Sequence, residues 1–237
     1  MQIKHKEVMK RMIKKTPKTK KTGELLTSIN LGKKYAGRYI LYYGAKKISK
    51  KGCSKKLPLV NKAYNDKNRG VTRLDSNGIG HIYMNCPSSY RSVKRHVHYV
   101  LSKKSGDGWL PKQYEKEIVC NVDKSFVKNA IKNRCYLIIN ALPIDEYIKN
   151  RIPESISLPY NSNKNNAAII KYIKDMGKKL PKLNEYANSR NILNIPIIVY
   201  CYSSKCNAGH KLIEILMKIG FTNILEYKEG ITGWLKN

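Results

Sequence analysis

Two cysteines near the C-terminus, Cys201 and Cys206, are the residues of this chain best placed for chemistry. Cys201 follows an apolar, β-branched run, residues 197–200, that predicts a buried strand. A short polar loop, residues 202–207, separates it from an amphipathic segment that predicts a helix. Loop amides and a helix dipole at such a position stabilise negative charge, so we expect a lowered pKa for the Cys201 thiol. The resulting thiolate is a nucleophile.

Neighbouring side chains supply the other parts that thiolate chemistry on an anionic donor requires. Hydroxyls and loop amides can donate to a sulfur anion, and a cation can hold the donor. Cys206 can act as a resolving thiol that attacks a persulfide or sulfenate on Cys201 and closes a disulfide. The alternative is that both cysteines are small, inert residues, because free cysteine is often merely buried. The candidate residues for binding the anion are Ser203, Ser204, Lys205 and His210.

Several segments upstream of Cys201 follow one another in a recognisable order. They are Asn121-Val122-Asp123 with a helical segment at 124–133, an apolar run at 136–139, Asp145-Glu146-Tyr147, Arg151-Ile152-Pro153 and Ile156-Ser157-Leu158-Pro159. Together with the Cys201 loop and a closing Gly-Ile-x-x-Trp at 230–234, they resemble a rhodanese-like domain over about residues 118–237. The resemblance implies a mostly parallel sheet flanked by helices, with Cys201 at the carboxyl end of a central strand. It also implies a sulfurtransferase of the thiosulfate type that forms a persulfide on Cys201.

The chain departs from the family pattern at positions that matter for activity. Asn140 and Leu142 stand where the family has Asp and Arg, and Asn150 and Arg151 stand where it has Gly-His. Cys206 occupies the loop position that is often Arg. Related phosphatases need that arginine as a planar fork for phosphate oxygens, so phosphatase activity is not expected. Whether the thiol is active remains open at this point.

Positive charge is concentrated in the N-terminal half. The chain has a net charge of +31, and residues 1–118 contain 29 Lys and Arg against 7 Asp and Glu, a net charge of +22. This density predicts that residues 1–118 associate with a polyanion, either nucleic acid or an acidic protein surface. Interleaved tyrosines (Tyr35, Tyr39, Tyr42 and Tyr43) could stack on bases, although strand cores use tyrosine in the same way. The candidate polyanion-binding residues are Lys14, Lys15, Lys18, Lys20, Lys21, Lys33, Lys34, Arg38, Arg91, Lys94 and Arg95.

The same half predicts a small basic α+β module that follows an extended basic tail. Apolar runs at 38–45 and 78–86 predict strands, and apolar residues at helical spacing predict a basic amphipathic helix at 89–104. The Gly- and Ser-containing segment 102–111 predicts a linker. We therefore expect a tail at 1–22, a module of unrecognised family at 23–110 and the rhodanese-like domain at 111–237.

Neither a metal nor a cofactor is expected. Five residues of the N-terminal half, Cys53, His81, Cys86, His96 and His98, have the right side chains for zinc, but no Cys-x2-Cys pair is present. The alternative to a zinc site is that the cysteines are buried and the histidines lie at the surface.

No apolar run approaches the length of a membrane span, and no secretory signal opens the chain. Scattered cysteines favour a reducing, intracellular (cytoplasmic) setting. Three functions fit: a sulfurtransferase tethered by its basic half, a non-catalytic component of a large assembly such as a virion, in contact with neighbouring proteins, or a nucleic-acid-binding protein with a vestigial enzyme domain.

Overall fold

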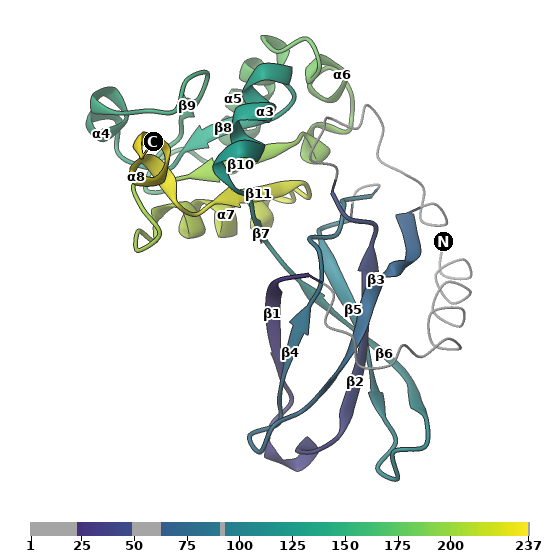
Figure 1. The fold of residues 1–237 in the computed structure, drawn as a ribbon. Coiled ribbons are helices and arrows are strands. Elements are labelled where there is room, and N and C mark those ends of the chain that lie inside the picture. Colours follow the sequence, from purple (N-terminus) through teal and green to yellow (C-terminus); the bar gives the residue numbers. More distant parts are fainter. Residues whose placement is uncertain (1–22, 49–62, 91–92, 237) are drawn as a thin grey trace. The chain divides into compact units, whose positions relative to one another are not determined.

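The computed structural model describes residues 23–48, 63–90 and 93–236, and the chain forms two compact units (Figure 1). The main division of the chain falls between Ile118 and Val119. The predicted boundary at 110/111 is therefore too early, because the last strand of the first unit continues to Glu117.

The first unit is rich in β-structure. A four-stranded sheet has the order β3-β2-β5-β6, and a separate pair joins β1 to β4, with all neighbours antiparallel. The predicted strands at 38–45 and 78–86 are confirmed as β2 and β4. The elements are β1 (Leu25–Asn30), η1 (Lys33–Tyr35), β2 (Tyr39–Ala45), β3 (Tyr64–Arg73), β4 (Ile79–Tyr83), β5 (His96–Ser102) and β6 (Trp109–Glu117).

The predicted basic helix at 89–104 is wrong, because its central part is the strand β5. This strand lies between β2 and β6, and every one of its residues is buried. A strand covered on both faces has no polar side, so its apolar residues do not alternate and a helical spacing can arise by chance. Its composition, His-Val-His-Tyr-Val-Leu-Ser, is nevertheless dominated by residues that favour strands.

The predicted linker at 102–111 is also wrong. This segment is the turn of a hairpin that joins β5 to β6, in which Ser102 pairs with Trp109. The amide of Lys103 donates to the carbonyl of Gly108 at 2.8 Å. Its glycines serve a tight turn rather than a flexible connection: Gly106 and Gly108 both have positive φ, which glycine adopts without steric cost.

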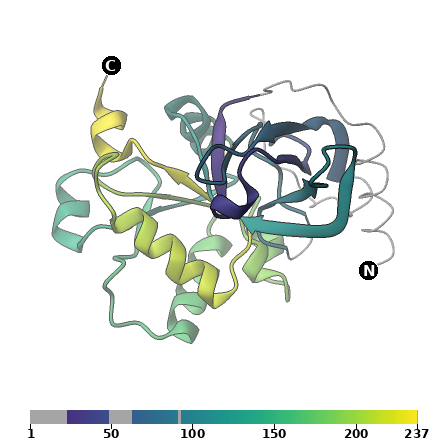
Figure 2. The same cartoon turned by 90° about the horizontal axis from the view of Figure 1, so that it is seen from below.

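The second unit is built on a parallel sheet with the strand order β7-β11-β10-β8-β9. Strand β10, which leads into the cysteine loop, lies at its centre, as the resemblance implied. Figure 2 shows helices on both sides of this sheet. The elements are β7 (Cys120–Asn121), α3 (Lys124–Asn133), β8 (Leu137–Asn140), α4 (Ile144–Lys149), β9 (Ile156–Ser157), α5 (Asn166–Lys178), α6 (Asn184–Ala187), η2 (Ile192–Asn194), β10 (Ile197–Tyr200), α7 (Ala208–Ile219), β11 (Ile224–Tyr227) and α8 (Gly230–Leu235).

One hydrophobic core fixes the cysteine loop to this sheet. Alternate residues of the central strands, such as Ile197 and Val199 of β10, pack with Leu212 and Leu216 of α7 and with Ile173 of α5. The strand immediately before Cys201 is thereby buried on both faces. The core also includes Cys201 itself, so the base of the loop is part of the most rigid region of the unit.

Local signals set the ends of the helices as the sequence predicts. Asp123 is the N-cap of α3, and its carboxylate accepts a hydrogen bond from the amide of Phe126 at 2.7 Å. Gly220 ends α7 in the left-handed region, with φ of 115°. These two positions define the start of the first helix and the end of the helix after the cysteine loop.

The cysteines within the described residues fall into two chemical groups. Cys86, Cys120 and Cys135 are disulfide-bonded, whereas Cys201 and Cys206 are free thiols. Structural disulfides persist in oxidising surroundings, so this finding does not support the predicted reducing compartment. Among the described residues, none of the helices has the length and apolar character that a membrane crossing requires.

Candidate active site

Strand β10 and helix α8 together fix the position of Cys201. The hydroxyl of Tyr200, the last residue of β10, accepts from the amide of Ile152 at 3.1 Å and lies 2.8 Å from the hydroxyl of Ser155. On the other side, the amide of Ile231 at the start of α8 donates to the carbonyl of Cys201 at 3.0 Å. The backbone before and after the cysteine is therefore held by hydrogen bonds to separate elements.

Gly230 lets α8 approach the loop this closely. Its φ is +60°, and a Cβ on this residue would lie 2.4 Å from the carbonyl oxygen of Cys201. No larger residue fits here without moving the loop. The closing Gly-Ile-x-x-Trp pattern thus has a steric reason in this chain.

The thiol of Cys201 is buried in a ring of loop atoms. Its Sγ lies 3.3 Å from the carbonyl oxygen of Cys206 and 3.8 Å from that of Ser203. Burial, together with a hydrogen bond with Cys206, raises the pKa of Cys201 to about 12, against a lowering by the backbone of Gly209 and Ser203. The expectation of a lowered pKa for Cys201 is therefore wrong, because desolvation outweighs the hydrogen bonds from the loop backbone.

Cys206 has the opposite shift. Burial opposes ionisation of this half-buried thiol, but hydrogen bonds from the Cys201 thiol and from backbone groups of the loop lower its pKa overall. The two thiols share a hydrogen bond, so the pair ionises as a unit. The first negative charge resides on Cys206, and the Cys201 thiol donates to it.

The predicted anion-binding residues surround this pair unevenly. Ser203 is half-buried beside the thiol, whereas Ser204 and Lys205 are exposed at the tip of the loop. His210 lies in the first turn of α7, exposed, with its Nε2 3.4 Å from the carboxylate of Glu214. The loop thus presents a cation and a hydroxyl to solvent above the buried sulfur.

Glu226 is a residue of this site that the sequence reasoning missed. It lies in β11, mostly buried, and burial raises the pKa of its carboxyl, against a lowering by His210. A Cβ on Gly209 would lie 3.6 Å from both the Sγ of Cys201 and a carboxylate oxygen of Glu226. The carboxyl and the thiol therefore both lie close to this glycine. The available signal was a single charge inside the apolar run Ile-Leu-Glu-Tyr.

The positions that depart from the family pattern are structural here. Asn140 is fully buried at the end of β8, and its side-chain oxygen accepts from the amide of Leu142 at 2.7 Å. Leu142 is buried in the core, so no charge stands at its position. The guanidinium of Arg151 lies over the ring of Tyr147 at 5.4 Å.

The predicted polyanion-binding residues fall into three groups. Lys33 and Lys34 are exposed on η1, and Lys94 is half-buried. Arg38 and Arg95 point inward: they donate to the carbonyls of Ser102 and Pro87, and Arg95 is buried. Arg95 is therefore not available to a polyanion, since a buried guanidinium cannot reach a partner's surface. The remaining predicted residues, Lys14, Lys15, Lys18, Lys20, Lys21 and Arg91, lie outside the described residues.

The tyrosines proposed for base stacking divide in the same way. Tyr42 and Tyr43 are core residues of β2, which excludes them from a stacking surface. Tyr39 is exposed, and the ring of Tyr35 is already contacted by Lys34 and Arg38 at about 5 Å. Tyr42 and Tyr43 therefore agree with the alternative expectation, in which tyrosines of a strand pack in the core.

Comparisons with known proteins bear on the second unit. A family model described as "Rhodanese-like domain" matches residues 123–237. No curated protein matches the chain.

Solved structures with similar folds include the human single-domain sulfurtransferase TSTD1, at 13% identity over 48% of this chain and 94% of its own, with a TM-score of 0.33. The single-domain sulfurtransferase RDL2 of Saccharomyces cerevisiae is 18% identical over 52% and 93% of the two chains, with a TM-score of 0.36. SseA of Escherichia coli, described as a 3-mercaptopyruvate sulfotransferase, is 15% identical over 52% of this chain and 50% of its own, with a TM-score of 0.30. The family match, the strand order and the position of Cys201 agree with the resemblance in the sequence. Residues 123–237 of this chain are a rhodanese-like domain.

Proposed function

We propose that the rhodanese-like domain is a sulfurtransferase in which Cys201 accepts a sulfur atom and Cys206 assists it. The observation that supports this is the free, hydrogen-bonded thiol pair at the carboxyl end of the central strand β10. Open α/β sheets position their sites at this end of the strands. An inert loop would need no second thiol of lowered pKa beside the first.

The first step transfers a sulfur from an anionic sulfane donor of the thiosulfate class. The Cys206 thiolate takes the proton from the Cys201 thiol while the Sγ of Cys201 attacks the outer sulfur of the donor. The sulfur–sulfur bond of the donor breaks, and sulfite leaves with its electron pair. The products are a Cys201 persulfide anion, a neutral Cys206 thiol and sulfite. Lys205 and the hydroxyl of Ser204, both exposed on the loop, attract the incoming anion.

Two fates of the persulfide follow from the pair. An acceptor thiolate can attack the outer sulfur, which regenerates the Cys201 thiolate and leaves a persulfide on the acceptor. Without an acceptor, Cys206 attacks the Sγ of Cys201, a disulfide forms and hydrosulfide leaves. In that step the outer sulfur is reduced and the two cysteines are oxidised, so no further oxidant is required.

Intact-protein mass spectrometry after incubation with thiosulfate tests this proposal. In wild type we expect a transient gain of one sulfur, followed by a species two hydrogens lighter than the starting protein. The Cys206→Ser variant should load more slowly and keep its persulfide, because it lacks both the base and the resolving thiol. The Cys201→Ser variant should gain nothing.

The control is alkylation of the native proteins with iodoacetamide, where modification of Cys206 shows that the loop is accessible to small reagents. A sulfur gain that persists in Cys201→Ser would contradict the assignment. So would no gain in wild type whose Cys206 alkylates, and a non-catalytic role of the domain would then be preferred.

We further propose that the basic N-terminal half tethers the domain to a polyanion. This rests on the charge of residues 1–118, net +22, and on the exposed Lys33 and Lys34. Such binding is electrostatic and independent of sequence in its main part. This second proposal concerns what the rhodanese-like domain is tethered to, and it is independent of the sulfur chemistry. The roles as a nucleic-acid-binding protein or as a component of a virion or other large assembly would use the same surface.

A further inference from the structure

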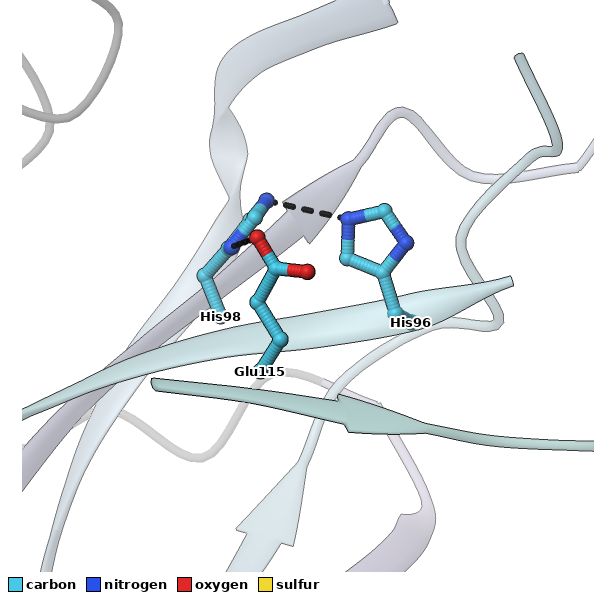
Figure 3. A group of neighbouring side chains, drawn as sticks. All are labelled: His96, His98 and Glu115. Atoms are coloured by element: carbon cyan, nitrogen blue, oxygen red, sulfur yellow. Dashed lines mark hydrogen bonds and ion pairs between the residues drawn. The ribbon is translucent and has the colours of Figure 1, made fainter. Parts of the chain in front are cut away.

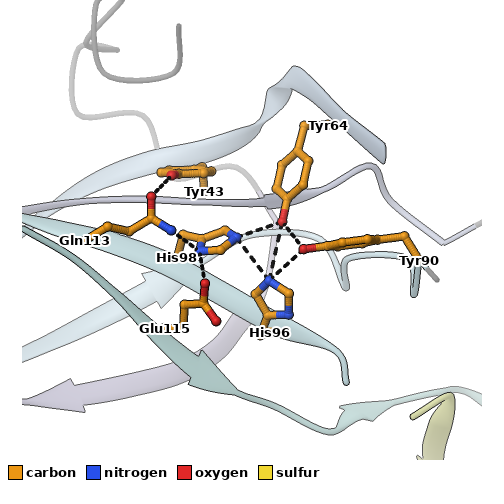
Figure 4. A network of polar contacts seen from close by, with 7 residues as sticks. All are labelled: Tyr43, Tyr64, Tyr90, His96, His98, Gln113 and Glu115. Carbon is orange, nitrogen blue, oxygen red and sulfur yellow. Dashed lines mark hydrogen bonds and ion pairs between the residues drawn. The ribbon is translucent and has the colours of Figure 1, made fainter. Parts of the chain in front are cut away.

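A buried polar cluster in the first unit contains side chains from strands β2, β3, β5 and β6, together with Tyr90, which lies between β4 and β5. His96 and His98 of β5 lie on one face of the sheet, with Glu115 of β6 directly beside His98 (Figure 3). Tyr64 of β3 and Tyr90 direct their hydroxyls at the two imidazoles (Figure 4). The histidines are 5% and 0% exposed.

Four ligand-type atoms converge at the centre of this cluster. The Nε2 atoms of His96 and His98 are 3.0 Å apart, and the hydroxyl oxygens of Tyr64 and Tyr90 are 2.7 Å apart. The Tyr64 oxygen lies 2.8 Å from Nε2 of His98 and 3.4 Å from Nε2 of His96, and the Tyr90 oxygen lies 2.9 Å from Nε2 of His96. Five of the six pairs among these atoms are thus 2.7–3.4 Å apart, so the four atoms surround one small space.

Few protons serve these contacts. Each hydroxyl brings one proton, and the two Nε2 atoms bring one between them, because their mutual contact is attractive only when one of them lacks a proton. Three protons then serve five contacts, so some protons are shared between two acceptors. A cation at the centre would instead let all four atoms point their lone pairs at one charge.

The surroundings of His98 orient it for this role. Its Nδ1 lies 3.2 Å from the carboxylate of Glu115, on the opposite side of the ring from His96. A carboxylate that accepts the Nδ1 proton leaves the lone pair on Nε2, as in the carboxylate–histidine pairs that support metal ligands. The side-chain nitrogen of Gln113 lies 2.6 Å from the same Nδ1, and the Gln113 oxygen accepts from the hydroxyl of Tyr43 at 2.7 Å. This NH2 group competes with the Nδ1 proton, so the lone pair is on Nε2 only in the form of His98 whose Nδ1 donates to Glu115.

We propose that His96 and His98, with the hydroxyls of Tyr64 and Tyr90, form a binding site for a divalent transition-metal ion such as Zn²⁺. A tetrahedral ion with bonds of about 2.0–2.1 Å holds its ligand atoms about 3.3 Å apart, so the four side chains need to separate by only a few tenths of an ångström. Imidazole donors select Zn, Cu, Ni or Fe over Ca and Mg, which prefer oxygen alone. Because protein atoms fill all four positions, the site is of the structural kind.

This proposal replaces the expectation of no metal, which considered a different set of residues. Of that set, His81 bonds to the hydroxyl of Ser28 at 2.8 Å, Cys86 is disulfide-bonded, and Cys53 lies outside the described residues. Only His96 and His98 come together. The proposal is independent of the sulfurtransferase activity, which concerns the other unit.

Zn²⁺ retention by the full-length protein tests the site. After incubation with Zn²⁺ and dialysis, we expect wild type to hold one ion that His96→Gln and His98→Gln lose. The exposed strand residue His81 provides the matched control, since His81→Gln should keep the ion. Cys201→Ser should also keep it, which separates this site from the thiol pair. Equal retention in His96→Gln and wild type, or none in wild type, would overturn the proposal.

Two further measurements guard against a variant that simply fails to fold. Zn²⁺ should raise the melting temperature of wild type, because an ion that binds only the folded state stabilises it. Glu115→Gln changes a side chain that is 54% exposed, so it should fold normally. It should weaken Zn²⁺ binding by about 10- to 100-fold, the usual loss when the partner of a ligating histidine is removed. Unchanged affinity in folded Glu115→Gln would remove that residue from the site.

Discussion

At the scale of single residues, the thiol pair decides how the site works. Burial keeps Cys201 protonated, with a pKa of about 12, and the loop stabilises the charge on Cys206 instead. The buried Cys201 thiol is hydrogen-bonded to its base, Cys206, and it stays protonated until a sulfur donor enters the loop. The loop therefore combines an acceptor thiol of raised pKa with a half-buried neighbouring thiol of lowered pKa, and the order in which the two ionise can be tested.

Alkylation with limiting iodoacetamide at neutral pH should modify Cys206 before Cys201, because only the thiolate attacks the reagent. Lowering the pH through the lowered pKa of Cys206 should protonate it and slow its modification. Cys201 should react appreciably only as the pH approaches its pKa of about 12. Peptide mapping by mass spectrometry distinguishes the two sites. Preferential modification of Cys201 at neutral pH would reverse our assignment of the charge.

At the scale of elements, the end of strand β10 is the junction that supports the loop. Tyr200 is fully buried, and its hydroxyl connects β10 to Ile152 and Ser155 in the segment before β9. In the sequence resemblance, Ile152 and Tyr200 belong to two separate motifs. In the structure, one hydroxyl joins them directly behind the cysteine.

Tyr200→Phe should lower the free energy of unfolding by about 1–3 kcal/mol, since it leaves the buried amide of Ile152 without its acceptor. Urea denaturation measures the loss. Tyr172→Phe is the matched control, because the hydroxyl of Tyr172 only donates to the partly buried carbonyl of Ser157. Its loss should be smaller, about 0.5–1.5 kcal/mol. Equal losses in the two variants would mean that the junction adds nothing beyond an ordinary hydrogen bond.

At the scale of the whole molecule, charge and chemistry are divided between the two units. Most of the basic excess, +22 of +31, lies in residues 1–118, whereas the thiol pair lies in the rhodanese-like domain. A basic surface gathers polyanions at long range and loses them as salt screens it. The division predicts that binding and catalysis respond to different mutations.

Binding of the full-length protein to single-stranded RNA should weaken steeply with salt, with log K falling linearly against log salt concentration. Removal of residues 1–22, which contain nine Lys and Arg, should make that slope shallower. Lys178→Ala with Lys179→Ala, on the second unit, should leave the slope unchanged. Fluorescence anisotropy over a salt series measures it. A slope near zero in the full-length protein would contradict polyanion binding.

Local patterns in the sequence predicted most of the second unit. Asp123 at the N-cap, Gly220 after α7 and the apolar run before Cys201 each act within a few residues, so their effects can be read directly. The family motifs added the mostly parallel sheet and the central position of the strand before Cys201. The same reasoning failed for β5, where burial on both faces removed the alternation that marks a strand.

What the sequence determined by itself was the rhodanese-like fold, the position of Cys201 at the end of a central strand and the basic character of residues 1–118. The directions of the two pKa shifts required the tertiary structure, because the pKa of Cys201 depends on burial by residues far along the chain. The tertiary structure also decided that His96 and His98 share one face. In a helix of 3.6 residues per turn, residues two apart point away from each other, whereas in a strand they point the same way.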